Sequence, residues 1–350
     1  MKMSEIIISK AVQKIRTEWA VSDAKRDEGL TTPENILRHD NISYGPYDEW
    51  NLLDVYYTKD VVAPQPVIVN IHGGGWVYGN KEIYQFYCMS LAQRGFTVVN
   101  FNYRLAPENR YPAALEDINN VFCFLEKEGA KYMADINNVF VVGDSAGAQL
   151  TSQYLTIMTN PEYAKLFTFK TPDITVRACG LNCGLYDARK CAERGLDECF
   201  IEYIGRKVTK LVYADEQLLD SLDALKHMTK EFPPAYVMSA HNDFLLPDAE
   251  PMYQHLQSLG VDSELKIYGS KEQEEIEARA LELDTEIELI RAKGLAQLEE
   301  DKAIAEAKLE AKREELDAMH QMENESDAEF YLRKLEAQNE YNDLKKDVSD

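Results

Sequence analysis

The chain has 350 residues, 45% of them hydrophobic and 10% aromatic, which is enough apolar material for one large domain or two ordinary ones. Its formal net charge of −23 at pH 7 argues against nucleic acid and against membrane surfaces as partners, because anionic surfaces would repel it. The N-terminal residues do not have the pattern of a signal peptide, and no apolar run reaches transmembrane length. We therefore expect a cytoplasmic protein in which the six cysteines are reduced.

The first 270 residues predict an α/β domain over residues 44–270, in which a mostly parallel sheet has helices on both faces. Residues 1–43 are expected to be a polar helical segment that forms part of a lid, and residues 187–233 a charged, helical cap insertion. Strands are expected at 66–71, 96–103, 138–142, 176–181, 235–239 and 265–268, and helices at 113–131, at 146–158 and around 253–256. Sheets of this kind bind ligands at the carboxyl ends of their strands.

The segment Gly143 to Gly147 has the pattern Gly-x-Ser-x-Gly and lies between a predicted strand and a predicted helix. Its glycines allow a turn too sharp for side chains near the serine. Such a turn lifts the Ser145 hydroxyl clear of the sheet and brings the amide of Ala146 to a helix N-terminus. A purely structural turn is the alternative interpretation of this segment alone.

A second motif, His72 to Trp76, ends an earlier predicted strand about 70 residues before the serine and contains three consecutive glycines. Such glycines let the backbone approach a substrate and aim N–H groups at a developing oxyanion. We interpret His72 as a hydrogen-bonding residue of this loop rather than as a general base. The two motifs together indicate a hydrolase site more strongly than either does alone.

These motifs, with the segment Tyr103 to Glu108 between them, resemble those of the hormone-sensitive-lipase-like esterases of the α/β-hydrolase superfamily. The resemblance covers roughly residues 42–270. It implies that Ser145 is the nucleophile and that the amides of Gly73, Gly74 and Ala146 form the oxyanion hole.

The same resemblance implies an acid after the next-to-last strand, in the chain order Ser, Asp, His of this fold. Asp243 lies there, and Asp248 is the alternative, although it precedes a helix and is equally suited to an N-cap. A histidine is then expected on the loop after the last strand, which ends near Ser270. No histidine occurs between His255 and His320.

The general base is therefore not identified. His241, close to the acid, and His320, in the tail, are the remaining candidates, and neither has the expected position. His39 and His227 lack a motif context, and His255 is expected to be a surface or packing residue of the helix after Asp243. Losing the histidine of a serine-protease triad lowers turnover roughly 10⁶-fold, so an esterase scaffold without this residue is expected to be very slow.

The composition changes sharply at Ser270. Residues 271–350 hold 12 Lys and Arg against 25 Asp and Glu, with one glycine and no proline, which suggests a fusion, an engineered chimera or a frame-altering event. Apolar residues recur four and three apart between Ile276 and Ile290, as in a heptad repeat. We predict a long acidic helical tail, with a separate final helix from Ala328 to about Lys346. The heptad-like stretch is either a solvated helix or a coiled coil that joins copies of the chain, and we favour the coiled coil.

Two main hypotheses of function follow. The first is a serine-dependent carboxylic ester hydrolase whose partner is a small acyl ester, such as an acetylated sugar or a xenobiotic, and which needs no metal or organic cofactor. The second is a catalytically inactive hydrolase domain joined to a coiled-coil module for oligomerisation or binding. An amidase or formamidase on the same fold is a third, weaker hypothesis.

Overall fold

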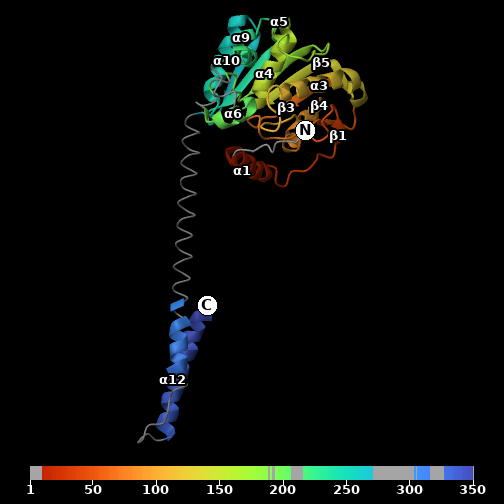
Figure 1. Cartoon of the computed structure of the whole chain (residues 1–350). Helices are drawn as coiled ribbons and strands as arrows, with labels where there is room; N and C mark the ends of the chain where they lie inside the picture. The colour runs from red at the N-terminus through yellow and green to blue at the C-terminus, as the bar shows by residue number, and fades with distance from the viewer. Residues whose placement is uncertain are drawn as a thin grey trace, which may run out of the picture. The chain divides into compact units, whose positions relative to one another are not determined.

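A computed structural model describes residues 10–187, 190, 194–205, 216–270, 303–304, 306–315 and 327–349 (Figure 1). The contacts within the chain divide it into two compact units, Met1–Ser270 and Lys271–Asp350. The first unit contains a sheet and the second contains helices.

In the described part of the first unit, eight strands form one sheet in the order β1-β2-β4-β3-β5-β6-β7-β8. The β1/β2 and β2/β4 pairs are antiparallel, and every other neighbouring pair is parallel. The strands are β1 (Ile36–Ser43), β2 (Leu52–Thr58), β3 (Gln65–Ile71), β4 (Thr97–Phe101), β5 (Ala134–Asp144), β6 (Val176–Asn182), β7 (Ala235–Ala240) and β8 (Ser263–Tyr268). The predicted α/β fold with a mostly parallel sheet is thus confirmed.

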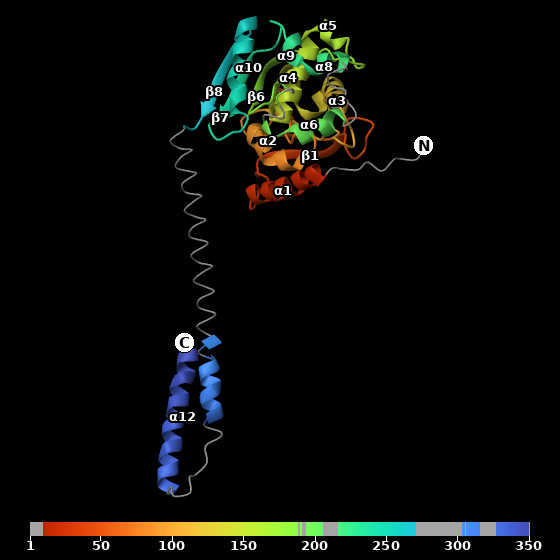
Figure 2. The ribbon, with the colours of Figure 1, turned by 60° about the vertical axis from the view of Figure 1, so that its left-hand side comes forward.

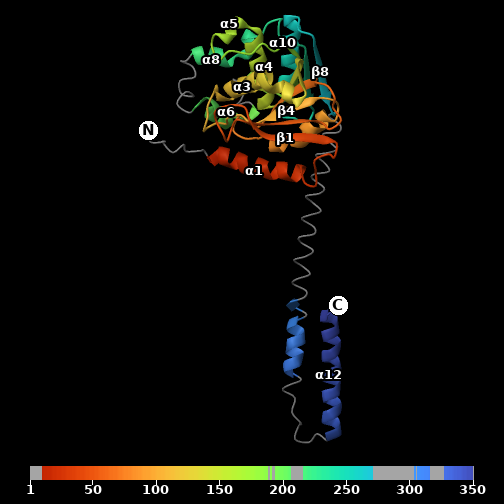
Figure 3. The same cartoon turned by 90° about the vertical axis from the view of Figure 1, so that its right-hand side faces the viewer.

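Helices cover both faces of this sheet (Figure 3). The main helices are α1 (Lys10–Arg26), α2 (Gln85–Ala92), α3 (Ala113–Glu128), α4 (Ala146–Thr159) and α10 (Leu246–Leu259), with a short 3-10 helix, η1 (Glu82–Tyr84), before α2. Met89 of α2 packs against Val98 and Ile68 on one face. On the other face, α3, α4 and α10 contribute to a larger core that includes Val69 and Ile71 of β3. Because β3 is buried from both sides, its central residues Val67 to Val69 are all apolar and do not alternate with polar ones.

The segment before Tyr44 differs from the prediction of a purely helical lid. Its first part is the helix α1, but Ile36–Ser43 is the strand β1, paired with β2 at the edge of the sheet. An edge strand tolerates charged residues such as Arg38 and Asp40 because one of its sides faces solvent, and these residues hide the apolar pattern of a strand. The strand β2 and the helix α2 were also not predicted.

The region of the predicted cap contains three described helices, α6 (Asp197–Ile204), α8 (Glu216–Leu222) and α9 (Ala224–His227). The ring of Tyr203 in α6 stacks on Trp76, with 5.0 Å between the ring centroids. The carbonyl of Tyr203 also accepts the N–H of Tyr111 (2.9 Å). The helix α6 therefore packs beside the glycine-rich loop that follows β3.

The helix α1 contacts the same loop from a different part of the chain. Arg16 Nε donates to the carbonyl of Val77 (2.8 Å), and the Tyr78 hydroxyl donates to Asp23 (2.7 Å). The ring of Trp19 meets that of Tyr78 edge to face at 5.7 Å. The N-terminal helix and the cap thus both fix segments next to the predicted oxyanion loop.

In the second unit, residues 306–315 are helical and run alongside α12 (Asp327–Ser349) (Figure 2). Lys312 pairs with Glu340 across the two helices (2.5 Å), and Ala337 is buried between neighbouring side chains. The helix α12 confirms the predicted final helix. The heptad-like stretch from Ile276 to Ile290 lies outside the described residues.

Among the helices that the structure describes, none combines the length and the apolar character that a membrane span requires.

Candidate active site

Ser145 lies on a tight turn between β5 and α4, at the carboxyl edge of the sheet. Its backbone has φ 51° and ψ −118°, an unfavourable conformation for a residue with a Cβ. The N–H of Ser145 donates to the carbonyl of Asn182 at the end of β6 (2.9 Å), which holds the turn. Among the described residues, the Ser145 hydroxyl has no hydrogen-bond partner, so it is available to a substrate.

Gly147 lets α4 start directly against the end of β3. A Cβ at this position would lie 2.1 Å from the carbonyl oxygen of Ile71 and 2.6 Å from that of His72. Only a glycine allows that approach. As a result, the first turn of α4, where Ala146 lies, adjoins the loop that begins at His72.

Gly74 has the backbone freedom that this loop requires, with φ 121°. Its carbonyl accepts the N–H of Tyr78 (2.9 Å), which closes the loop into a turn. Among the residues that the structure describes, no partner is recorded for the Gly74 amide. This N–H is therefore available to an oxyanion.

The amide of Gly73, in contrast, is already engaged. It donates to Asp144 Oδ1 (3.0 Å) and to Tyr84 Oη (3.1 Å), while the Tyr84 hydroxyl donates to Asp144 Oδ2 (2.7 Å). Burial raises the pKa of Asp144 to about 6, although these hydrogen bonds oppose the shift. The predicted role of Gly73 as an oxyanion donor would require Asp144 to release it, which leaves Gly74 and Ala146 as the stronger candidates.

His72 is a buried part of the loop. Its Nδ1 lies 2.7 Å from the carbonyl oxygen of Gly73, and its ring stacks on that of Tyr103 with 4.1 Å between the centroids. Burial lowers the pKa of His72 to about 4, against the effect of the hydrogen bond to Gly73. A neutral imidazole that donates to its own loop agrees with a structural role and not with that of a general base.

A cavity of about 420 Å³ brings Ser145 and Asp243 to one site. Residues from the ends of β5, β6 and β7 line it, as expected for a ligand site at the carboxyl edge of a parallel sheet. Its apolar side chains include Phe86, Tyr87, Met238, Phe244 and Leu245.

Asp243 is held by its own loop, because its Oδ1 accepts the N–H of Leu245 (2.7 Å). Burial raises the pKa of Cys183 to about 12, and the charge of Asp243 adds to the shift, so the thiol stays protonated. Cys183 is half-buried and lines the same cavity, because the chain turns there after β6 has ended.

The alternative acid, Asp248, has another partner. It is 3% exposed, lies in the first turn of α10, and pairs with Arg194 Nε (2.6 Å). This ion pair joins the cap region to α10. The geometry therefore favours Asp243 as the acid.

Residues 68–272, more than half of the chain, match a family model described as the alpha/beta hydrolase fold. This chain belongs to that family. Among curated proteins, the chain is 29% identical to the probable carboxylic ester hydrolase LipM of Mycobacterium tuberculosis, over 60% of this chain and 49% of that protein. It is 26% identical to the esterase LipC of the same organism, over 63% of this chain and 54% of LipC. The chain thus spans about half the length of these relatives.

Solved structures agree with this fold. An inhibited esterase B from Lactobacillus rhamnosis is 26% identical, has a TM-score of 0.66, and the match covers 74% of this chain and 85% of that one. A bacterial heroin esterase superposes with a TM-score of 0.61 at 20% identity, over 73% of this chain and 82% of that one, and shows the fold alone.

Most histidines of the chain are poorly placed to act as a general base. Four of them have partners elsewhere: His39 with Tyr57 Oη (2.8 Å), His72 with the Gly73 carbonyl, His227 with Asp220 (3.0 Å) and His255 with the Leu225 carbonyl (2.9 Å). His241 lies at the carboxyl ends of β7 and β8, where its backbone N–H donates to the carbonyl of Tyr268 (2.9 Å). His320 lies outside the described residues.

Two residues of the site had no role in the sequence analysis. Asp144 lies within the Gly-x-Ser-x-Gly motif, so its position was known, but the pattern does not show that it accepts a hydrogen bond from Gly73. Tyr84 belongs to η1, which no sequence signal predicted.

Within the described residues, no group of three or more His, Cys, Asp or Glu side chains is arranged to hold a metal ion.

Proposed function

We propose that this chain is a serine-dependent carboxylic ester hydrolase that acts on small acyl esters. The observation that carries the proposal is the free hydroxyl of Ser145, which lies on a strained turn at the wall of a cavity that Asp243 also lines. The identity with curated carboxylic ester hydrolases supports the same reaction class.

In the proposed reaction, Ser145 Oγ attacks the carbonyl carbon of the ester while its proton passes to a base. The amides of Gly74 and Ala146 stabilise the negative charge on the carbonyl oxygen. The tetrahedral intermediate then expels the alcohol, which takes up the proton, and water removes the acyl group from Ser145. Asp243 would orient the base, and His241 is the base that we test first, because both follow β7.

The side chains around the cavity suggest the kind of ester. Phe86, Tyr87 and Phe244 give it an aromatic wall, with Tyr87 and Phe244 exposed at 42% and 56%. Burial of an apolar acyl or alcohol group against such a wall is favourable. We therefore propose short-chain apolar esters as the substrates, with acetylated sugars as the second class to be compared.

The alternative function is an inactive hydrolase domain joined to an oligomerising tail. The observation that favours it is that four of the described histidines have partners elsewhere. Without a base, the oxyanion hole and substrate binding alone would provide roughly 10³–10⁴-fold acceleration over water.

One experiment separates the two functions. The full chain is treated with p-nitrophenyl butyrate, with an acetylated xylo-oligosaccharide and with a fluorophosphonate probe, and Ser145→Ala is the control. We expect hydrolysis of the butyrate ester and labelling of Ser145, both lost in Ser145→Ala. A folded chain that neither hydrolyses an ester nor takes up the probe would reject the esterase. If activity is found, His241→Gln should lower it, and added imidazole should restore part of it.

The acid has a matched pair of variants. Asp243→Asn should lower kcat, or the rate of labelling of Ser145, by roughly 10²–10⁴-fold, since a triad aspartate orients the base. Asp248→Asn should leave that rate unchanged and lower the free energy of unfolding instead, because Arg194 loses its buried partner. The reverse result would assign the acid to Asp248.

A further inference from the structure

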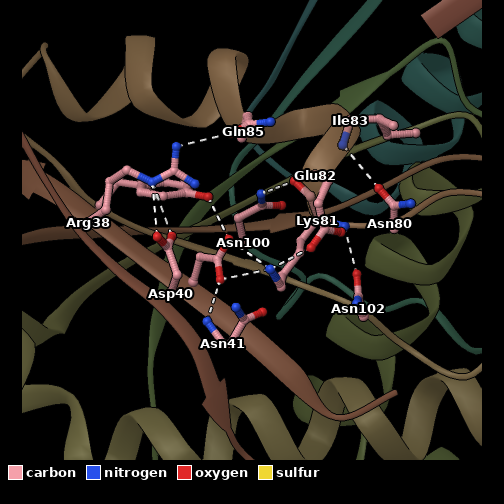
Figure 4. Close-up of polar contacts among 12 residues, drawn as sticks. Arg38, Asp40, Asn41, Asn80, Lys81, Glu82, Ile83, Gln85, Asn100 and Asn102 are labelled. Atoms are coloured by element: carbon pink, nitrogen blue, oxygen red, sulfur yellow. Dashed lines mark hydrogen bonds and ion pairs between the residues drawn. The ribbon is translucent and has the colours of Figure 1, made fainter. Parts of the chain in front are cut away.

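A buried lysine follows the oxyanion loop and is held from three directions. Lys81 is 2% exposed, and its Nζ pairs with the carboxylate of Asp54 on β2 (2.9 Å). Its backbone N–H donates to Asn102 Oδ1 (2.6 Å), and its carbonyl accepts from Asn100 Nδ2 on β4 (2.6 Å) (Figure 4). The amide, the carbonyl and the side chain of this one residue are thus all held by groups on β2, on β4 or directly after β4. Its Nζ also pairs with the neighbouring Glu82 (2.7 Å).

The groups that hold Lys81 form a polar row on an otherwise apolar face of the sheet. Asp54, Asn100 and Asn70 lie directly opposite one another on β2, β4 and β3. Two residues toward the other end, the same face carries the apolar row of Tyr56, Val98 and Ile68 under α2. Such a polar row is costly unless its groups are paired.

Lys81 provides much of that pairing. Asp54 accepts from Lys81 Nζ, from the N–H of Asn41 (2.8 Å) and from the Tyr56 hydroxyl (2.8 Å). Asn100 accepts from Asn70 (3.3 Å) as well as donating to the Lys81 carbonyl. Asn70 in turn lines the cavity at Ser145, so the row runs from β2, next to the edge strand, to the site.

The loop transmits the position of Lys81 to the oxyanion glycines because it folds closely on itself. A Cβ on Gly79 would lie 2.5 Å from His72 Nδ1 and 2.6 Å from the carbonyl oxygen of Gly73. The N–H of Tyr78 is bonded to the carbonyl of Gly74 (2.9 Å). Residues 78 and 79 are therefore in direct contact with residues 72 to 74, and only residue 80 separates them from Lys81.

We propose that Lys81, held by Asp54, Asn100 and Asn102, is a positioning residue that keeps the amide of Gly74 fixed at the site. Lys81 touches no substrate; it acts through the loop. The inference rests on the proposed ester hydrolysis for its effect on turnover, but not for its effect on the loop itself.

The test separates positioning from stability. Removing one partner leaves a buried charge unpaired and destabilises the whole protein, whereas replacing both members of a buried ion pair is often neutral. The decisive variant is therefore the double substitution Lys81→Met with Asp54→Asn in the full chain. Asn102→Ala is a milder second variant that removes only the acceptor of the Lys81 N–H. Asn138→Ala, which removes a bond to Asp135 on β5, is the matched control.

Two quantities are measured, amide hydrogen exchange of residues 72–81 and steady-state ester hydrolysis. We expect faster exchange in this loop in both variants, unchanged exchange in α10, and neither effect in Asn138→Ala. In the double variant we also expect kcat to fall by about 10²-fold with KM nearly unchanged, since misplacing a reacting group by about 1 Å costs that much.

The outcomes distinguish this inference from the proposed function. Unchanged exchange in the loop of the folded variants, or faster exchange with an unchanged kcat, would overturn the role of Lys81. A wild-type chain without esterase activity or Ser145 labelling would reject the proposed function, and exchange would then still decide whether Lys81 holds the loop.

Discussion

Among single residues, Asp144 has the environment that most directly links the site to pH. It adjoins the nucleophile, and its two oxygens accept from Tyr84 Oη and from the amide of Gly73. Burial raises its pKa to about 6, so in the folded chain it binds a proton more tightly than an exposed aspartate does. A raised pKa of this kind favours the folded state at low pH, and that contribution is lost as the pH rises through about 6.

The substitution Asp144→Asn removes this titration. The wild type should lose up to about 3 kcal/mol of unfolding free energy between pH 4 and pH 7 that the variant does not lose, since one pKa unit corresponds to about 1.4 kcal/mol. The unfolding free energy of the variant minus that of the wild type should therefore increase from pH 4 to pH 7 and stay constant above pH 7. Urea unfolding at a series of pH values measures it, and a difference independent of pH would contradict the raised pKa.

Among the elements, the junction of β3 with α4 positions the nucleophile relative to the oxyanion loop. We expect Gly147→Ala to lower the free energy of unfolding by about 3 kcal/mol, because the new methyl group would meet the backbone carbonyl of Ile71, which cannot move aside easily. Labelling of Ser145 should fall as well, since α4 must shift.

Gly129→Ala is the matched control for this substitution. Gly129 has a right-handed helical conformation, with φ −54°, and the nearest atom to its Cβ would be a side-chain methyl of Ile136 at 3.2 Å. The change should alter the unfolding free energy by no more than about 1 kcal/mol. Urea unfolding compares the two, and equal effects would show that the contact at Gly147 is not the cause.

The same scale shows why part of the fold could be predicted from the sequence. The strands β3 and β4 were found because buried strands are short apolar runs, and the site was found because its two motifs follow predicted strands. The strand β2 was missed because Asp54 interrupts an otherwise apolar run, and that aspartate is buried only because Lys81 reaches it. No local pattern records a pair that is 27 residues apart.

The long-range contacts within the site could not be predicted from the sequence for the same reason. The bond from Gly73 to Asp144 joins residues 71 apart, and it decides which loop amides are free. Motifs give the residue types that a reaction needs at each strand end. The packing between helices and strands decides which of those groups face each other. This packing is known only from the three-dimensional structure.

At the scale of the whole molecule, the second unit raises the question of self-association. Leu332 and Leu335, three residues apart on α12, are 59% and 45% exposed, and Ile304 is 48% exposed. Apolar side chains on one helix face favour packing against another helix. The net charge of residues 271–350 opposes it, since 12 basic against 25 acidic residues leave −13. We propose that the tail joins two copies of the chain, and that salt strengthens the association by screening this charge.

Sedimentation of the full chain tests this proposal. We expect the mass of an oligomer. The oligomer fraction should be larger at about 0.5 M salt than at about 0.05 M, because the Debye length is severalfold shorter at the higher concentration. The double substitution Leu332→Glu with Leu335→Glu should give a monomer, because it places two charges in the apolar contact. Asn339→Glu adds a charge at another exposed position of α12 and should leave the oligomer in place. A wild-type chain that sediments as a monomer at both salt concentrations would reject a role of the tail in assembly, and the exposed leucines would then be a solvated helix surface.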